Sequence, residues 1–155
     1  MPSVCLHELC AALVKKNVTV SIAESCTGGY MSSAITNIPG ASRCLVGSFV
    51  VYSRESKEIL LGVPKGVNLC SIDCVTAMNR GLKKVLGGDL QISISGKING
   101  SVFYDIFYEG QHDSHELRLS GTCCRAIAKF WIVRTVIEAV LRKIAFYPSS
   151  SEIFS

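Results

Sequence analysis

The ten residues from Val20 to Gly29 constrain the fold more than any other part of the sequence. They read Val-Ser-Ile-Ala-Glu-Ser-Cys-Thr-Gly-Gly, an apolar stretch that runs into small polar residues and two glycines. This pattern is typical of a strand that turns directly into a helix, because glycine relieves crowding in the turn. The first amides of a helix have no partner within the helix, so we expect them to be free to bind a phosphate or an oxyanion. Taken alone, Ser25 in this turn is either an ordinary helix cap or a hydroxyl nucleophile.

The rest of the chain alternates in the same way between strand and helix patterns. The predicted helices are 3–16, 28–37, 54–61, 71–86 and 122–144, and the predicted strands are 18–23, 46–52, 90–95, 101–108 and 116–119. Alternating strands and helices predict a layered α/β domain, and the short connections between the strands after residue 90 favour antiparallel neighbours. We therefore expect a three-layer α/β/α sandwich with a mixed sheet.

Length and composition point to one domain. The 155 residues are enough for a single core, which we place at 1–146, with a frayed tail at 147–155. No apolar run approaches the ~20 residues of a membrane helix, and the amphipathic start does not resemble a secretory signal. We expect a cytoplasmic protein that does not bind membranes. The apolar run Phe130–Val133 exceeds what one helix face buries, which suggests a homodimer.

The charged and sulfur-containing residues narrow the classes of ligand. The net charge of +4 is dispersed, which makes nucleic acid an improbable partner and suits an anionic small molecule. None of the eight cysteines forms the spaced pairs of a zinc site, so we expect reduced structural thiols and no metal. Cys26 is the one thiol whose position next to a helix start favours reactivity.

A hydroxyl nucleophile needs a base, and the strand that ends near Val51 supplies one. Lys57 follows that strand by a few residues, and Tyr52 stands at its end. The three histidines, His7, His112 and His115, do not lie in positions typical of a triad. Serine–lysine pairs replace the triad in some hydrolases, provided that burial or a nearby cation keeps the amine neutral.

Four motifs in order now identify a resemblance. They are Ala-Glu-Ser-Cys-Thr-Gly-Gly from Ala23, Ile-Pro-Gly-Ala-Ser from Ile38, Tyr-Ser-x-Glu-x-Lys from Tyr52, and Leu-Gly-Val-Pro from Leu61. The chain resembles the CinA C-terminal domain family of nicotinamide-nucleotide amidohydrolases, the NMN deamidases, in its stand-alone form. The resemblance implies that a carboxamide is hydrolysed and that no cofactor is needed.

The resemblance also implies roles for individual residues. Ser25 would form an acyl-enzyme, Tyr52 would orient or relay the proton, and Lys57 would be the general base. The substrate, a small nucleotide, would be bound by five residues: Thr27, Gly28, Gly29, Ser95 and Gly96.

Two departures from the family pattern keep other functions open. The family's glycine-rich excursion after the strand equivalent to 90–95 is missing beyond Gly96, and Gly121-Thr122-Cys123 stands where the family has Gly-Asp-Arg. Arg125 or Lys97 are the candidates to replace that arginine. A catalytically weakened nucleotide-binding or assembly module is the alternative function, and a role on DNA is a third.

Overall fold

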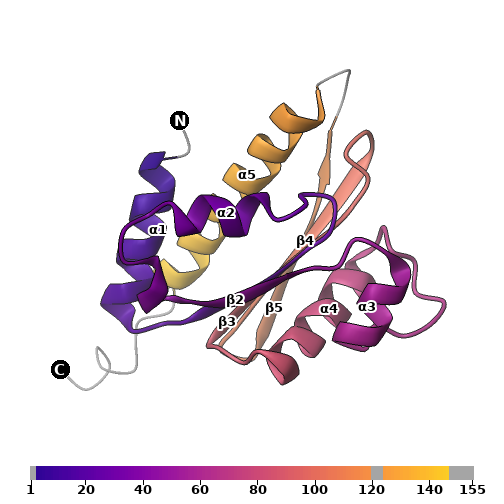
Figure 1. Ribbon diagram of the computed structural model, residues 1–155, viewed down its shortest axis with the longest axis horizontal. Coiled ribbons are helices and arrows are strands. Elements are labelled where there is room, and N and C mark those ends of the chain that lie inside the picture. Colours follow the sequence, from indigo (N-terminus) through magenta and orange to yellow (C-terminus); the bar gives the residue numbers. More distant parts are fainter. Residues whose placement is uncertain (1–2, 120–123, 147–155) are drawn as a thin grey trace.

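The computed structural model describes residues 3–119 and 124–146 as a five-stranded sheet with helices on both faces (Figure 1). The helices are α1 (Ser3–Lys16), α2 (Tyr30–Thr36), the short 3-10 helix η1 (Ala41–Arg43), α3 (Arg54–Leu61), α4 (Ile72–Val85) and α5 (Arg125–Phe146). The strands are β1 (Val20–Glu24), β2 (Leu45–Val50), β3 (Leu90–Gly96), β4 (Ser101–Tyr108) and β5 (Gln111–Arg118). The predicted α/β sandwich with a mixed sheet is confirmed.

The strand order explains where a site can form. The order is β2-β1-β3-β4-β5, with β2, β1 and β3 parallel and β4 and β5 antiparallel. The chain leaves β1 for β2 on one side and later returns to β3 on the other side, so the topology switches at β1. Ligands in sheets of this kind bind at the carboxyl ends of the strands beside such a switch.

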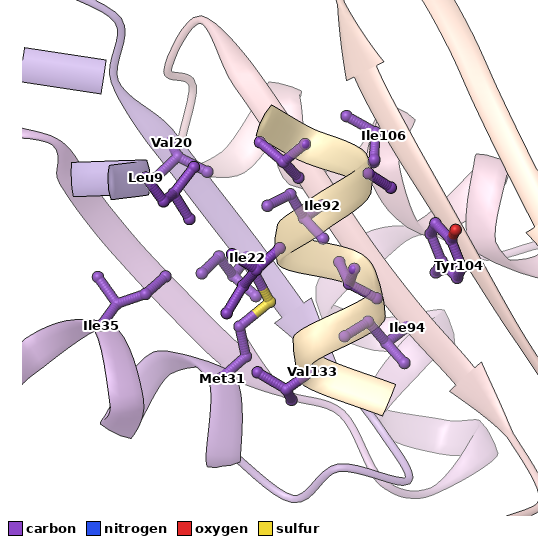
Figure 2. Close-up of a cluster of buried hydrophobic side chains, with 14 of the residues drawn as sticks. Leu9, Val20, Ile22, Met31, Ile35, Ile92, Ile94, Tyr104, Ile106 and Val133 are labelled. Atoms are coloured by element: carbon purple, nitrogen blue, oxygen red, sulfur yellow. The ribbon is translucent and has the colours of Figure 1, made fainter. Parts of the chain in front are cut away.

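Two apolar clusters hold the layers together. The larger lies between the sheet and α1, α2 and α5, and Figure 2 shows side chains from all of these elements meeting around Ile22 of β1. The smaller cluster lies on the opposite face, where α4 and the end of α3 cover Ala23 and Val51. Because β1 lies between both clusters, all five of its residues are buried.

The boundaries differ from the sequence predictions for physical reasons. Helix α2 begins at Tyr30 rather than 28, because Gly28 and Gly29 have φ angles of +62° and +92°. The edge strand β5 begins five residues before the predicted 116–119, because its exposed residues are polar and lack an apolar alternation. The predicted start of the last helix at 122 and the tail at 147–155 lie outside the described residues.

The apolar run of α5 is divided between the core and the surface. Ile132 and Val133 are buried in the chain's own core, whereas Trp131 is 49% exposed, with the Arg134 guanidinium over its ring. Two of the four residues in the apolar run Phe130–Val133 are therefore buried within this chain and are not available to a second copy. The homodimer stays a prediction. Among the described helices, none is long and apolar enough to cross a membrane.

Candidate functional site

Ser25 lies at the switch point of the sheet, directly after the last residue of β1. Its amide donates to the Ile94 carbonyl of β3 at 3.0 Å, and the Val51 amide donates to the Glu24 carbonyl at 2.8 Å. These bonds tie the turn at Ser25 to the neighbouring chain segments on both sides. The side chain is 6% exposed, and it lines the cavity described below.

Helix α3 places an amine against this hydroxyl. The Ser53 side chain caps the helix by accepting from the Ser56 amide at 3.0 Å, and the buried face of the helix carries Lys57 and, one turn later, Leu61. The Lys57 side chain is 1% exposed. Its Nζ lies 3.0 Å from Ser25 Oγ, 2.8 Å from the Val51 carbonyl oxygen and 3.3 Å from that of Tyr52.

The surroundings of Lys57 favour the neutral amine. Burial lowers the pKa of Lys57 from its ordinary 10.5, and the nearby Arg54 guanidinium lowers it further. A neutral amine has two N–H groups and one lone pair. With the N–H groups donated to the carbonyls of Val51 and Tyr52, the lone pair is left for the Ser25 hydroxyl. The arrangement can therefore remove a proton from Ser25.

Cys26 is a weaker candidate for the nucleophile than its neighbour Ser25. Burial is the main cause that raises the pKa of the Cys26 thiol from 9.0 to about 11, although its own amide and Lys57 act in the opposite direction. A thiol with this pKa is protonated near pH 7 and is a weak nucleophile. The seven cysteines among the described residues are free thiols, and Cys123 lies outside those residues.

A cavity of about 460 Å³ opens over the Ser25–Lys57 pair. The structure brings five of the predicted site residues to its wall: Ser25, Tyr52, Lys57, Ser95 and Gly96. The side chain of Tyr52 is 65% exposed, which places it at the rim rather than in the interior.

The remaining wall combines apolar and cationic groups. Leu69 and Ile98 contribute apolar surface, and Lys97, Asn99 and Arg125 contribute polar side chains. Among the described residues, no aspartate or glutamate lines the cavity. From the sequence, Lys97 and Arg125 were candidates to replace a family arginine, and nothing pointed to Asn99. The reason is that the turn between β3 and β4, which holds Lys97 and Asn99, meets α5 only in the folded chain.

The structure places Thr27, Gly28 and Gly29 beside the cavity and not on its wall. Thr27 is 1% exposed, and its hydroxyl donates to the Glu24 carboxylate at 2.7 Å. A Cβ on Gly28 would lie 3.3 Å from Lys129 Nζ. Their role in substrate binding stays a prediction, and their visible contribution is to shape the turn.

The expectation that the first amides of the helix are free to bind an anion is wrong. The amides of Met31 and Ser32 donate to the Glu24 carboxylate at 2.9 and 3.0 Å. Glu24 is not among the site residues predicted from the sequence. The available signal was its position, an acidic residue that ends a buried strand just before a helix.

Ser95 and Gly96 complete the edge at the end of β3. The Ser95 hydroxyl donates to the Leu69 carbonyl at 3.0 Å, which fastens the loop before α4 to the cavity wall. Gly96 has a φ of +143°, and a Cβ there would overlap the Ser101 carbonyl and lie 2.7 Å from Val102 Cα. Only glycine fits this close approach of β3 and β4.

Comparison with known proteins places these features in a family. A family model described as the CinA C-terminal domain matches residues 4–130. A CinA-like protein of Thermotoga maritima is 38% identical over 131 residues, and one of Petrotoga mobilis is 46% identical over 88 residues. These matches cover 75% and 54% of this chain but only 32% and 22% of the two relatives, so the chain spans about a third of their length or less.

Solved structures show the same fold over nearly the whole chain. A CinA superfamily protein from Klebsiella pneumoniae superimposes with a TM-score of 0.89 at 24% identity, covering 95% of this chain and 99% of its own. A competence/damage inducible protein from Agrobacterium tumefaciens superimposes with a TM-score of 0.80 at 25% identity, covering 89% and 94% of the two chains.

Proposed function

Because this chain belongs to the CinA C-terminal domain family, we propose that it is an amidohydrolase that converts nicotinamide mononucleotide to nicotinate mononucleotide and ammonia. The observation that carries the proposal is the 3.0 Å contact between Lys57 Nζ and Ser25 Oγ at a buried switch point of the sheet. A nucleophile and a base in hydrogen-bond reach, beside a cavity, are the minimum for acyl transfer.

The reaction begins with proton transfer from Ser25 to the neutral amine of Lys57. Ser25 Oγ then attacks the carboxamide carbon, and the Lys57 ammonium gives its proton to the amide nitrogen, so that the C–N bond breaks and ammonia leaves. Lys57, neutral again, takes a proton from the water that attacks the ester carbonyl. The bond from Ser25 Oγ to the carbonyl carbon then breaks, and the Lys57 ammonium returns the proton to Ser25 Oγ as the product leaves as the carboxylate. Tyr52, at the rim, orients or relays the proton during these transfers.

The charge of the cavity supports an anionic substrate. Lys97, in the turn after β3, and Arg125, at the start of α5, both line the cavity. Among the described residues, no aspartate or glutamate lines it to offset their positive charge. Leu69 and Ile98 offer apolar surface to a flat ring. This combination fits a molecule with a phosphate at one end and an aromatic carboxamide at the other.

Ammonia release from nicotinamide mononucleotide tests the proposal. We expect Ser25→Ala to abolish turnover and Ser21→Ala to preserve it. Ser21 is a matched control because it is a fully buried serine on the same strand, with its hydroxyl donated to the Gly87 carbonyl at 2.8 Å, away from the cavity.

The other outcomes lead to different functions. Turnover that persists in Ser25→Ala would contradict the proposed mechanism. A folded wild-type protein that binds the nucleotide in calorimetry but releases no ammonia would instead support the alternative, a binding module that has lost efficient catalysis.

A further inference from the structure

Glu24 carries a carboxylate that is wholly buried next to the nucleophile and yet does not line the cavity. Its two oxygens accept four hydrogen bonds. Oε1 accepts from the Thr27 hydroxyl at 2.7 Å and the Met31 amide at 2.9 Å, and Oε2 accepts from the Ser32 amide at 3.0 Å and the Ser32 hydroxyl at 2.6 Å. Four donors meeting two oxygens is the pattern of an ionised carboxylate.

These four bonds close the loop that contains Ser25. The Thr27 bond holds the middle of the loop, and the bonds from Met31 and Ser32 hold its far end at the start of α2. The Gly28 amide adds a bond to the Ser25 carbonyl at 3.0 Å. Glu24 therefore joins the strand that ends before Ser25 to the helix that begins after it.

The carboxylate also accounts for the two glycines of the loop. A chain that leaves β1 at Glu24 and returns its amides to the same side chain seven and eight residues later must reverse sharply. Gly28 and Gly29 supply the reversal with φ angles of +62° and +92°. The loop geometry and the carboxylate thus form one unit.

Burial of a charge is costly unless each lone pair is satisfied, and a serine or threonine cap would satisfy the start of a helix at lower cost. The carboxylate reaches both the loop and the helix, which a hydroxyl cannot do with a single oxygen. Resting on the amidohydrolase function proposed above, we propose that Glu24 is a positioning residue that holds Ser25 Oγ within hydrogen-bond distance of Lys57 Nζ.

The substitution Glu24→Gln tests this role with little change in volume. The side-chain nitrogen of glutamine is a donor and would face two other donors, either those of Ser32 or those of Thr27 and Met31. Two of the four hydrogen bonds to this side chain would therefore be lost. We expect kcat to fall about 10- to 100-fold with little change in KM, because a displacement of about 1 Å at a reacting group has an effect of this size.

Asp105 provides a matched control. It is a second fully buried carboxylate, and its Oδ2 and Oδ1 accept from Asn79 Nδ2 at 2.8 Å and the Ser114 hydroxyl at 2.6 Å. We expect Asp105→Asn to reduce the melting temperature to a similar extent and to leave kcat at the wild-type value. A loss of kcat in both variants would overturn the proposal, since it would show a general effect of destabilisation.

Crystal structures of the two variants give a readout that does not depend on any activity. We expect the Ser25 Oγ to Lys57 Nζ contact to be lost or split between two conformers in Glu24→Gln and to persist in Asp105→Asn. A contact that persists in Glu24→Gln overturns the positioning role, whether or not the protein deamidates a nucleotide. If the contact is lost and the wild type releases no ammonia, the positioning role stands and the proposed function fails.

Discussion

At the scale of single residues, the protonation state of Lys57 decides whether Ser25 can lose its proton. Burial lowers the pKa of Lys57 from 10.5, so the neutral amine becomes abundant at a lower pH than for a lysine in water. Only the neutral amine can act as a base. We therefore expect kcat to rise with pH through this lowered pKa and to level off at a lower pH than it would for a lysine with the ordinary pKa of 10.5.

The pH profile has a specific control in Arg54, whose guanidinium is one of the groups that lower the pKa of Lys57. We expect Arg54→Gln to move the rising limb of the profile to higher pH. A shift to lower pH, or an activity that falls over the range where Lys57 loses its proton, would contradict the assignment of Lys57 as the base.

The neighbouring thiol gives a second prediction at this scale. Because the pKa of Cys26 is raised to about 11, the thiolate needed for attack is scarce at neutral pH. We expect Cys26→Ala to retain turnover within about a factor of ten of the wild type, measured by ammonia release. If Cys26→Ala were as inactive as Ser25→Ala, the nucleophile would have to be reconsidered.

At the scale of elements, the contact between α3 and α4 determines where Lys57 lies. A Cβ on Gly81 of α4 would overlap the Leu61 carbonyl and lie 2.8 Å from Leu61 Cα, at the end of α3. We expect Gly81→Ala to destabilise the fold by about 1–3 kcal/mol in urea denaturation and to reduce turnover, because α3 must move away.

Gly47 is the control for this prediction. A Cβ there would lie 3.6 Å from Leu86 Cδ1, an ordinary contact, and its φ is not in the left-handed region. We expect Gly47→Ala to change the free energy of unfolding by less than about 1 kcal/mol. Equal effects of the two substitutions would show that the close approach of α3 and α4 is not what limits stability.

Helix α4 and strand β5 show which elements can be predicted from sequence patterns and which cannot. The α4 helix was predictable, since Ser71 caps it by accepting from the Cys74 amide at 3.2 Å and its apolar positions repeat at helical spacing. Strand β5 was underestimated because pairing with β4, rather than its own composition, makes it a strand.

At the scale of the whole molecule, the cavity joins cations from distant parts of the chain. Lys97 lies in the turn between β3 and β4, and Arg125 begins α5. We expect Lys97→Ala and Arg125→Ala each to raise KM for nicotinamide mononucleotide about tenfold, equivalent to about 1.4 kcal/mol, with a smaller effect for nicotinamide riboside, which lacks the phosphate.

Lys84 on the exposed side of α4 is the matched control, because it lines a different surface hollow. We expect Lys84→Ala to leave both KM values unchanged. If Lys97→Ala and Arg125→Ala raised KM equally for both substrates, the two cations would not be binding the phosphate.

The sequence by itself determined the alternation of strands and helices, the turn at Ser25 and the candidate trio of Ser25, Tyr52 and Lys57, because these depend on local spacing and on motifs of a few residues. The tertiary structure decided which groups are available for chemistry. Folding joins the carboxyl ends of separate strands, buries Lys57 against Ser25, and pairs the Met31 and Ser32 amides of α2 with Glu24. Burial and hydrogen-bond partners are properties of the packed chain, and local spacing does not contain them.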